Sequence, residues 1–500
     1  MSSPESKQPE IPLWDDPNEI IKLSRNTELV RALSQFLGCT QKDIKEALKL
    51  RATEGVRITY TSKKTGKEVT KTFDRGYCTY KTPKPNGIDM RTINDPAPIL
   101  KDLQSRLLNI FRQIPISMAA KGGEPKTGII DNVKPHIPNG FTIAMDLKDA
   151  FPSVDGQRIT ANLKGFLHKQ LEMSFPHLCK DLREQFVQAI ITLVIKDDEL
   201  PQGAPTSTHL LNVVMAKTDA DIFKLIHGEE SRMHSPQFTR YVDDLTVSWK
   251  ATKEFLEPWL LAQKIYKKAE NTMYMLDNFQ KRCLPDIASA IKALESLHIY
   301  LADKVEAKTL RSKLSAARKE LLDTKTQALE DGNNDIYHAL DALIGKLDLV
   351  ISEIEVDDAI IPDIQEDIRA RVARNGFRIN DSKTKVWTPS SPTVREITGV
   401  TISKDGRLGI PKKAMQLYTK LARDAALNPE DLPKDLKTRS GEPDPVKIAH
   451  TLQGVRAFVR QVKRKAPKRF EEYYQRARSR FFEGWVASKK TQPIRYGNGY

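Results

Sequence analysis

The stretch Arg240-Tyr-Val-Asp-Asp-Leu-Thr-Val-Ser248 places two adjacent carboxylates, Asp243 and Asp244, between apolar flanks. This pattern favours two strands joined by a tight turn that carries the acids in a half-buried position. Two like charges held side by side repel each other, and a bound divalent cation removes that cost. Carboxylate oxygens at such a turn suit Mg²⁺, which keeps other coordination positions for water and substrate phosphates. On this motif alone, an exposed acidic turn is the alternative.

A third carboxylate is expected to join this pair. The run Phe141-Thr-Ile-Ala-Met-Asp146 is a short apolar segment that ends on an acid, which suits a neighbouring strand. Two metal ions held by three carboxylates stabilise the attacking and leaving oxygens of an in-line phosphoryl transfer. The sequence therefore indicates phosphoryl-transfer chemistry.

The charge of the chain indicates a polyanionic partner. The formal net charge of the 500 residues is +15. Most of this excess lies in residues 401–500, which hold 23 Lys and Arg residues against 10 Asp and Glu residues. A basic region of this size is typical of nucleic-acid binding. A solvated basic surface is the alternative on charge alone.

Composition also excludes several classes of protein. No apolar run reaches the roughly 18 residues that a membrane span needs, so we expect no membrane partner. The polar N-terminus, residues 1–12, lacks the apolar core of a signal peptide. The four cysteines lie far apart, which argues against a zinc site or a disulfide framework and suits the reducing cytoplasm. They are Cys39, Cys78, Cys179 and Cys283.

Hydrophobic periodicity predicts a mixture of helices and strands. Residues 250–370 differ from the rest because they are long, charged and helical in period, with apolar stripes that suit paired antiparallel helices or a short coiled coil. An ordinary helical subdomain is the alternative for this stretch. Helices are predicted over 13–50, 99–113, 157–196, 206–227 and 411–485, and strands over 56–82 and 376–410.

Several motifs resemble those of reverse transcriptases, in the order of that family. Tyr241-Val-Asp-Asp244 resembles the family's Y-x-D-D signature, and Met145-Asp-Leu-Lys-Asp-Ala-Phe-Pro-Ser153 resembles its first catalytic motif. The other matching segments are Tyr80-Lys-Thr-Pro-Lys-Pro-Asn-Gly87, Met90-Arg-Thr-Ile-Asn-Asp-Pro96, Leu200-Pro-Gln-Gly-Ala-Pro-Thr-Ser207, Asn375-Gly-Phe-Arg-Ile-Asn-Asp-Ser-Lys-Thr384 and Ile397-Thr-Gly-Val400.

The resemblance is closest to bacterial retron and antiphage-defence reverse transcriptases, which are related to the group II intron enzymes. Ile129-Ile-Asp-Asn-Val-Lys-Pro-His136 is similar to a retron element, although Val133 stands where those enzymes usually have Ala. Residues 250–370 also depart from the family, because this interval is normally much shorter.

The resemblance implies an α+β fold, a right-hand polymerase with fingers, palm and thumb and an inserted helical subdomain. The expected boundaries are 1–50 for an N-terminal tail and helices, 51–140 for the fingers, 141–250 for the palm, 251–370 for the insertion, 371–410 for the completion of the palm, 411–485 for a basic helical thumb, and 486–500 for a flexible tail.

The resemblance also assigns the metal ligands. Asp146 and Asp243 are expected to bind both of two Mg²⁺ ions, with Asp244 supporting them, and Mn²⁺ is an expected substitute. The backbone carbonyl of Leu147 is expected to complete one of the two metal sites.

Four basic residues are expected to handle the phosphates. Arg91 would clamp the triphosphate in the bidentate way that a guanidinium allows. Lys84 would assist as a point charge, or would simply be solvated. Lys383 matches the lysine that protonates the pyrophosphate leaving group, with Lys385 as the alternative.

The sugar and base of the nucleotide are expected to meet three further residues. Phe151 matches the bulky side chain that excludes a ribose 2′-hydroxyl, which implies deoxynucleotide substrates. An ordinary core phenylalanine is the alternative. Gln202 and Gly203 would frame the incoming nucleotide, although they also suit a tight turn before a helix.

The C-terminal region carries the expected nucleic-acid contacts. Tyr496 and Tyr500 lie in a Gly-rich tail and could prime synthesis through a hydroxyl, as in some related enzymes, or belong to an inert terminus. The residues expected to hold the template and primer backbone are Arg456, Arg460, Lys463, Arg464, Lys465, Lys468 and Arg469.

The resulting functional hypothesis is RNA-directed DNA synthesis. The resemblance implies dNTP substrates, a structured non-coding RNA as template, a DNA product and a role in antiphage defence. Residues 251–370 could also mediate homo-oligomerisation. The alternatives are a template-independent or protein-primed DNA polymerase, an RNA-synthesising polymerase, and an inactive RNA-binding scaffold on the same fold.

Overall fold

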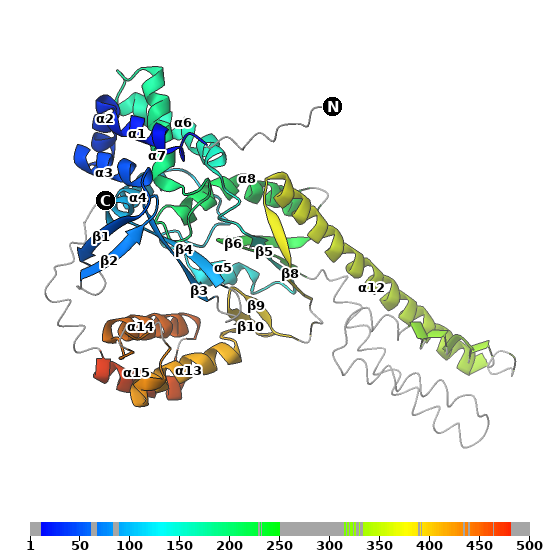
Figure 1. The fold of residues 1–500 in the computed structure, drawn as a ribbon. Helices are drawn as coiled ribbons and strands as arrows, with labels where there is room; N and C mark the ends of the chain where they lie inside the picture. Colours follow the sequence, from blue (N-terminus) through cyan, green and yellow to red (C-terminus); the bar gives the residue numbers. More distant parts are fainter. Residues whose placement is uncertain are drawn as a thin grey trace, which may run out of the picture.

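Four antiparallel strands form the central sheet of the computed structural model, in the order β6-β7-β5-β8 (Figure 1). The central strands are β5, Phe141–Lys148, and β7, Asp244–Lys250, and both are largely buried. The outer strands are β6, His234–Tyr241, and β8, Arg378–Trp387. The structure describes residues 12–61, 68–83, 90–228, 231, 233–250, 315–316, 318–319, 321–323, 325–326, 330, 334–388, 391, 393–433, 436–438, 441–463 and 465–481.

Three long helices supply much of the core. They are α6, Gly156–Ser174; α7, Lys180–Val194; and α8, Ser207–His227, which packs against strand β6 of the sheet. The helical stretch predicted over 157–196 is therefore two helices, separated by a turn around Pro176. Helix α8 is buried along much of its length, so its apolar residues do not follow a single stripe. The core continues from these helices into β5 and β7.

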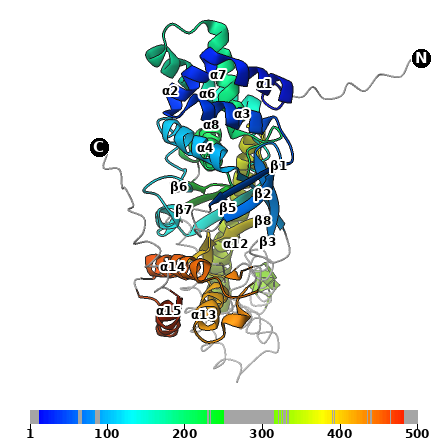
Figure 2. The same cartoon turned by 60° about the vertical axis from the view of Figure 1, so that its left-hand side comes forward.

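An N-terminal layer packs against these helices, as Figure 2 shows. It contains α1, Pro17–Arg25; α2, Thr27–Leu37; and α3, Gln41–Arg51, as the periodicity over 13–50 predicted. Side-chain caps begin each helix, since Asp16, Asn26 and Thr40 accept hydrogen bonds from backbone N–H groups of the first turns. Their buried faces join the same core as the central sheet.

Two hairpins and one helix connect this layer to the central sheet. The first hairpin pairs β1, Val56–Thr61, with β2, Glu68–Phe73, and the second pairs β3, Tyr77–Pro83, with β4, Met90–Pro96. Helix α4, Pro98–Phe111, follows directly. Residues 84–89, between β3 and β4, lie outside the described part of the chain. Short α5, Ile129–Val133, and the 3₁₀ turn η1, Lys134–His136, then lead into β5.

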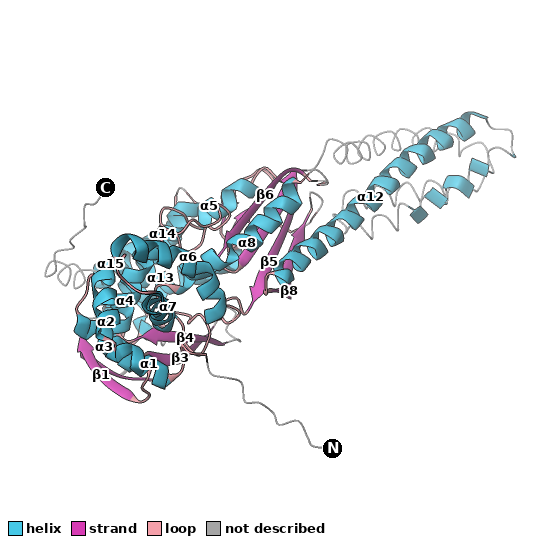
Figure 3. Cartoon of the chain, turned by 90° about the horizontal axis from the view of Figure 1, so that it is seen from above, coloured by secondary structure: helices cyan, strands magenta, loops and turns pink. Residues whose placement is uncertain are grey.

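The long helix α12, Asn334–Arg374, projects away from the body (Figures 1 and 3). Its 41 residues correspond to roughly 60 Å at 1.5 Å per residue. Its C-terminal end enters the main core through Ile364, Ile368 and Val372. Farther out, Arg318 pairs with Asp348 and Lys325 with Asp341. Residues 251–314 of the predicted insertion lie outside the described part.

The C-terminal part forms a smaller sheet and a helical unit, which lie below the central sheet in Figure 2. Strands β9, Arg395–Ile397; β10, Val400–Ile402; and β11, Leu408–Gly409, pair in the order β11-β10-β9. Helices α13, Lys412–Leu427; α14, Pro445–Val462; and α15, Lys468–Phe481, share an apolar core, with η2, Pro429–Asp431, between the first two.

The fold is therefore α+β, as predicted, with strands and helices segregated rather than alternating. Among the helices that the structure describes, none is both long and apolar enough to cross a membrane.

A buried ion pair joins α8 to the central sheet. The guanidinium of Arg240 on β6 donates two hydrogen bonds of 2.9 Å to the carboxylate of Asp219 on α8, and both side chains are fully buried. The same guanidinium also donates to Asn212 and to the carbonyl of Val242. Removal of either partner would leave an uncompensated charge in the interior.

We therefore expect Asp219→Ala to lower the free energy of unfolding by about 3–5 kcal/mol. Urea denaturation followed by circular dichroism measures the change. The matched control is Glu366→Ala, which removes an exposed partner of Arg369 and should cost less than about 0.5 kcal/mol. Similar losses for the two variants would contradict the importance of the buried pair.

Candidate active site

The two adjacent carboxylates lie at the turn of the β6–β7 hairpin. Tyr241 pairs with Asp244, so Val242 and Asp243 form a two-residue connection. Val242 has a φ of 60°, a conformation that is rare for a β-branched residue. Strain of this kind persists only where surrounding contacts impose it, and it is frequent at functional sites.

Two neighbours hold the turn in place. Arg240 donates a 2.9 Å hydrogen bond to the carbonyl oxygen of Val242. On the other side, Gly122 lies so close that a Cβ atom there would come within 2.6 Å of Val242 Cγ2 and 2.7 Å of its backbone nitrogen. Gly122 is held by its neighbour Lys121, whose N–H donates to the carbonyl of Arg240. Only glycine fits this contact without moving the turn.

Strand β5 brings the third carboxylate to the same place. Asp146 lies directly opposite Asp244 in the β5–β7 pairing. Just beyond this pair, the N–H of Leu147 donates a 2.9 Å hydrogen bond to the carbonyl of Asp243. The three predicted acids therefore come together at one end of two central strands, and Leu147 is adjacent to them.

Burial and mutual repulsion perturb these acids. Burial is the main cause that raises the pKa of Asp244 to about 7, and the charges of Asp243 and Asp146 add to it. Burial also raises the pKa of Asp243, and the charge of Asp146 acts in the same direction. The positive charge of Arg91 opposes this shift for Asp243. Titratable groups perturbed in this way are typical of functional sites.

A bulge in β8 directs Lys383 onto Asp146. Ala144 and Asp146 on β5 are separated by one residue and pair with Lys385 and Asn380 on β8. Four residues, 381–384, lie between these partners, so β8 bulges there. The ammonium of Lys383 donates a 2.9 Å hydrogen bond to Asp146 Oδ2. This bond is the main cause that raises the pKa of Lys383 and keeps it protonated. Bulges commonly re-aim side chains beside active sites.

The alternative lysine, Lys385, also lies near the acids. Its positive charge lowers the pKa of Asp244, although less than that of Lys383 does. The side chain of Asn380 lies 3.4 Å from Asp146 Oδ2. Of these two lysines, Lys383 is the one that donates a hydrogen bond to an acid of the site, Asp146.

The donor set fits a hard divalent cation. Carboxylate oxygens are the ligands that Mg²⁺ prefers, and a cation would relieve the repulsion that raises the pKa of the two turn acids. In the described part of the chain, however, no three His, Cys, Asp or Glu side chains are arranged as a ready-made metal cluster. The acids would therefore need water or substrate phosphates to complete a coordination shell.

The segment Leu200–Ser207 packs against the strand that carries Arg91. The N–H of Asn94 on β4 donates a 2.7 Å hydrogen bond to the carbonyl of Gln202. Gly203 has a φ of 118°, and a Cβ atom there would lie 3.1 Å from the carbonyl oxygen of Asn94. This close approach favours glycine at position 203. Arg91 is exposed on the same strand, while Lys84 lies outside the described residues.

Phe151 lies in the turn that follows β5. Its side chain is half-buried and packs against the main core, and its carbonyl accepts a hydrogen bond from the N–H of Val154. Partial burial alone does not distinguish the sugar-selecting role of Phe151 from that of a core phenylalanine.

Sequence reasoning missed an N-terminal contribution to the site. The indole N–H of Trp14 and the backbone N–H of Gly156 both donate to Asp198 Oδ1, at 2.8 and 2.9 Å. Asp198 lies two residues before Leu200, whose N–H donates to the carbonyl of Val154. Trp14 thus connects the segment after Phe151 to the segment before Gln202. A lone tryptophan in a polar stretch offers no pattern that would reveal this.

A second missed residue, Asp15, anchors the same region. Its carboxylate accepts hydrogen bonds from the guanidinium groups of Arg51 and Arg75, at 2.9 and 3.0 Å, and from the N–H of Asp198. Arg51 is fully buried and also donates to the carbonyl of Thr192. Since ion pairs between segments far apart in the sequence leave no periodic signal, this network becomes visible only in the folded chain.

A third missed group lies behind the sheet. His136 is buried between Ser248 and Thr239, and its two ring nitrogens lie 2.6 and 2.8 Å from their hydroxyl oxygens. Burial lowers the pKa of His136 to about 3, so the ring is neutral. Arg395 on β9 donates to the carbonyls of His136 and Ile137. The retron-like segment therefore ties the small sheet to the central one.

The basic C-terminal residues lie in different environments. Arg456 bonds to the carboxylate of Glu471 on α15 and stacks 4.6 Å from the ring centre of Tyr474, so it holds two helices together. Arg469 and Lys463 line a groove of about 610 Å³ beside α13. Arg460, Lys465 and Lys468 are exposed, whereas Arg464, Tyr496 and Tyr500 lie outside the described part.

Part of this chain is similar in sequence to known reverse transcriptases. Residues 82–275 match the reverse transcriptase (RNA-dependent DNA polymerase) family. The chain is 32% identical over 183 residues to the retron Mx162 reverse transcriptase of Myxococcus xanthus, and this match covers 36% of each of the two proteins. It is 30% identical over 170 residues to the retron Ec86 reverse transcriptase of Escherichia coli, covering 34% of this chain and 47% of that protein. The retron Mx65 reverse transcriptase of Myxococcus xanthus is 31% identical over 179 residues, covering 35% and 40%.

The family match indicates a reverse transcriptase domain within residues 82–275. The relatives that this part of the chain resembles are bacterial retron reverse transcriptases. The matches span less than half of the length of these three curated relatives. Dependence on a divalent metal is general for such domains.

The contact between Gly122 and Val242 yields a test of the carboxylate turn. Gly122→Ala should displace the turn, and a shift of about 1 Å in a catalytic group can cost about 100-fold in rate. Single-nucleotide incorporation measures the loss, with thermal unfolding monitored in parallel. Gly165→Ala is the control, because a Cβ atom there meets nothing within 4 Å. A folded Gly122→Ala variant with the wild-type rate would contradict the proposed tight contact.

Proposed function

We propose that this protein is an RNA-directed DNA polymerase that joins deoxynucleotides by phosphoryl transfer assisted by two Mg²⁺ ions. The observation that carries the proposal is the pairing of Asp146 opposite Asp244, with Asp243 on the adjoining turn. The match of residues 82–275 to the reverse transcriptase family supports it.

In this proposal, Asp146 and Asp243 hold both ions, Asp244 supports them, and the carbonyl of Leu147 contributes to one. When bound, the ions lower the charge on the transferred phosphoryl group and align the primer hydroxyl with it. Mn²⁺ would substitute because it also accepts carboxylate and water ligands. The raised pKa values of Asp243 and Asp244 support this assignment, since a nearby cation favours the ionised forms.

The basic residues would act on the triphosphate. Arg91 clamps the phosphates, and its charge already acts on Asp243. Lys383 is protonated and bonded to Asp146. The Lys383 ammonium would donate its proton to the departing pyrophosphate. Lys385 remains the alternative donor, and Lys84 would assist Arg91.

Sugar selection would depend on Phe151. Phe151 is half-buried five residues after Asp146, and a bulky ring at this position would exclude a ribose 2′-hydroxyl. Gln202 and Gly203 would frame the nucleotide from the segment packed on β4, which supports their assignment.

The larger parts of the fold would correspond to a right hand. In this assignment the fingers span 51–140, the palm 141–250 and 371–410, and the thumb 411–485. Five cations of the thumb, Arg460, Lys463, Lys465, Lys468 and Arg469, would contact phosphates of the template and primer. Arg456 would support them indirectly through Glu471.

The biological template would be a structured non-coding RNA, and the role would be antiphage defence. The similarity to retron reverse transcriptases supports the RNA and DNA partners. Residues 251–370 could mediate homo-oligomerisation.

Asp243→Ala tests the chemistry. We expect incorporation of dNTPs on an RNA template to fall by at least about 10³-fold, because the metal site loses a ligand while the fold persists. Binding of the same RNA, measured by fluorescence anisotropy, should change little. An inactive wild-type protein that still binds RNA would favour the scaffold alternative, and undiminished incorporation by the variant would refute the metal assignment.

Phe151→Val tests sugar selection. The smaller side chain should leave dNTP incorporation within about tenfold of the wild type and raise incorporation of NTPs by at least about tenfold. Primer extension with each nucleotide set, with and without RNA template, measures both. Equal use of NTPs and dNTPs by the wild type would contradict the role of Phe151, and synthesis without template would favour the template-independent alternative.

A further inference from the structure

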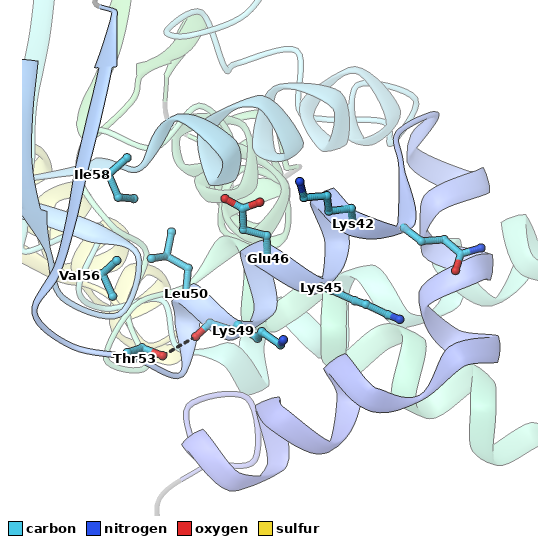
Figure 4. Close-up of a pocket in the computed structure, with 9 residues that line it drawn as sticks. Lys42, Lys45, Glu46, Lys49, Leu50, Thr53, Val56 and Ile58 are labelled. Atoms are coloured by element: carbon cyan, nitrogen blue, oxygen red, sulfur yellow. Dashed lines mark hydrogen bonds between the residues drawn. The ribbon is translucent and has the colours of Figure 1, made fainter. Parts of the chain in front are cut away.

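A groove separate from the active site lies between α3 and β1. It has a volume of about 610 Å³, within the roughly 300–1,000 Å³ typical of ligand-binding pockets. Figure 4 shows Val56 and Ile58 of β1 on one wall and Leu50, Glu46 and Lys42 of α3 on the other. None of these residues belongs to the carboxylate site or to the predicted nucleic-acid contacts.

The strand wall of this groove is a free sheet edge. In the described part of the chain, β1 pairs only with β2. Figures 1 and 2 both place α3 on the side of β1 that faces away from β2. Every second residue of β1 therefore leaves its backbone N–H and C=O without a strand partner among the described residues. An unpaired edge of this kind is a template for another extended chain.

The side chains of the groove define what such a chain would carry. Val56 and Ile58 are half-buried against the small core that contains Leu50, so the floor is apolar at alternate positions of β1. On the helix, Lys42, Lys45 and Lys49 are spaced by three and four residues and share one face. Three cations against the single anion Glu46 give the groove a net positive charge.

We propose that this groove binds an extended acidic peptide of a protein partner, which adds to β1 as a third strand. Alternate apolar side chains of the peptide contact Val56 and Ile58, and its carboxylates pair with Lys42, Lys45 and Lys49. Strand addition of this type derives affinity from backbone hydrogen bonds and specificity from alternate side chains.

A nucleic acid fits this groove less well. The lining contains no aromatic side chain on which a base could stack, and such stacking dominates single-strand recognition. Glu46 lies among the lysines and would repel a phosphate backbone. The free backbone edge of β1 has no complement in a nucleic acid, whereas it matches an extended peptide.

The test uses the full-length protein and a fluorescein-labelled hexapeptide of alternating valine and glutamate. Anisotropy at about 150 mM salt should give a dissociation constant of about 10–100 µM. The double variant Lys42→Glu with Lys49→Glu should weaken binding by at least about tenfold. The control Lys169→Glu with Lys180→Glu makes the same charge change on exposed residues of α6 and α7 and should leave binding unchanged. Both variants should retain wild-type primer extension.

Two hexapeptides N-methylated on either set of alternate amides test the strand pairing. One of them should lose binding, because only one set faces β1. The proposal is overturned if no saturation is reached at about 1 mM peptide, or if both methylated peptides bind like the parent. It is also overturned if the lysine variant weakens binding of a labelled oligouridine but not of the peptide, since the groove would then be a nucleic-acid surface.

Discussion

The antiparallel pairing of β5 with β7 determines the arrangement of the site. It places Asp146 opposite Asp244 and next to Asp243, so that three like charges share a half-buried position. Such an arrangement opposes folding unless other interactions impose it. The buried Arg240 supplies one of them, because it pairs with Asp219 and also bonds to the carbonyl of Val242. The same guanidinium therefore stabilises the core and holds the strained turn.

Positive charges reach the acids from different segments of the chain. Lys383 comes from the bulge in β8 and Arg91 from the β3–β4 hairpin, and each opposes the repulsion among the carboxylates. In the proposed reaction the same cations would meet the phosphates of the incoming nucleotide. Because these cations come from separate elements, the carboxylates could exchange them for metal ions and substrate without unfolding of the site.

The N-terminal layer serves two different purposes in this interpretation. On its inner side, Trp14 and Asp15 bind the turn at Asp198 and so support the segments that carry Phe151 and Gln202. On its outer side, α3 and β1 form the proposed peptide groove. The inner contacts are buried and specific, whereas the groove is open and lined by lysines, which suits an exchangeable partner.

The sequence alone predicted the enzyme class and most of the elements. Periodicity located the helices of residues 13–50 and the β6–β7 hairpin, because a half-buried element repeats its apolar residues at its own period. The ordered motifs identified Asp146, Asp243 and Asp244. Only the tertiary structure decided how these acids are held, since the bulge that aims Lys383, the contact of Gly122 with Val242 and the buried Arg240–Asp219 pair join residues that are distant in sequence. Such contacts depend on packing and charge compensation between elements, which no local pattern records.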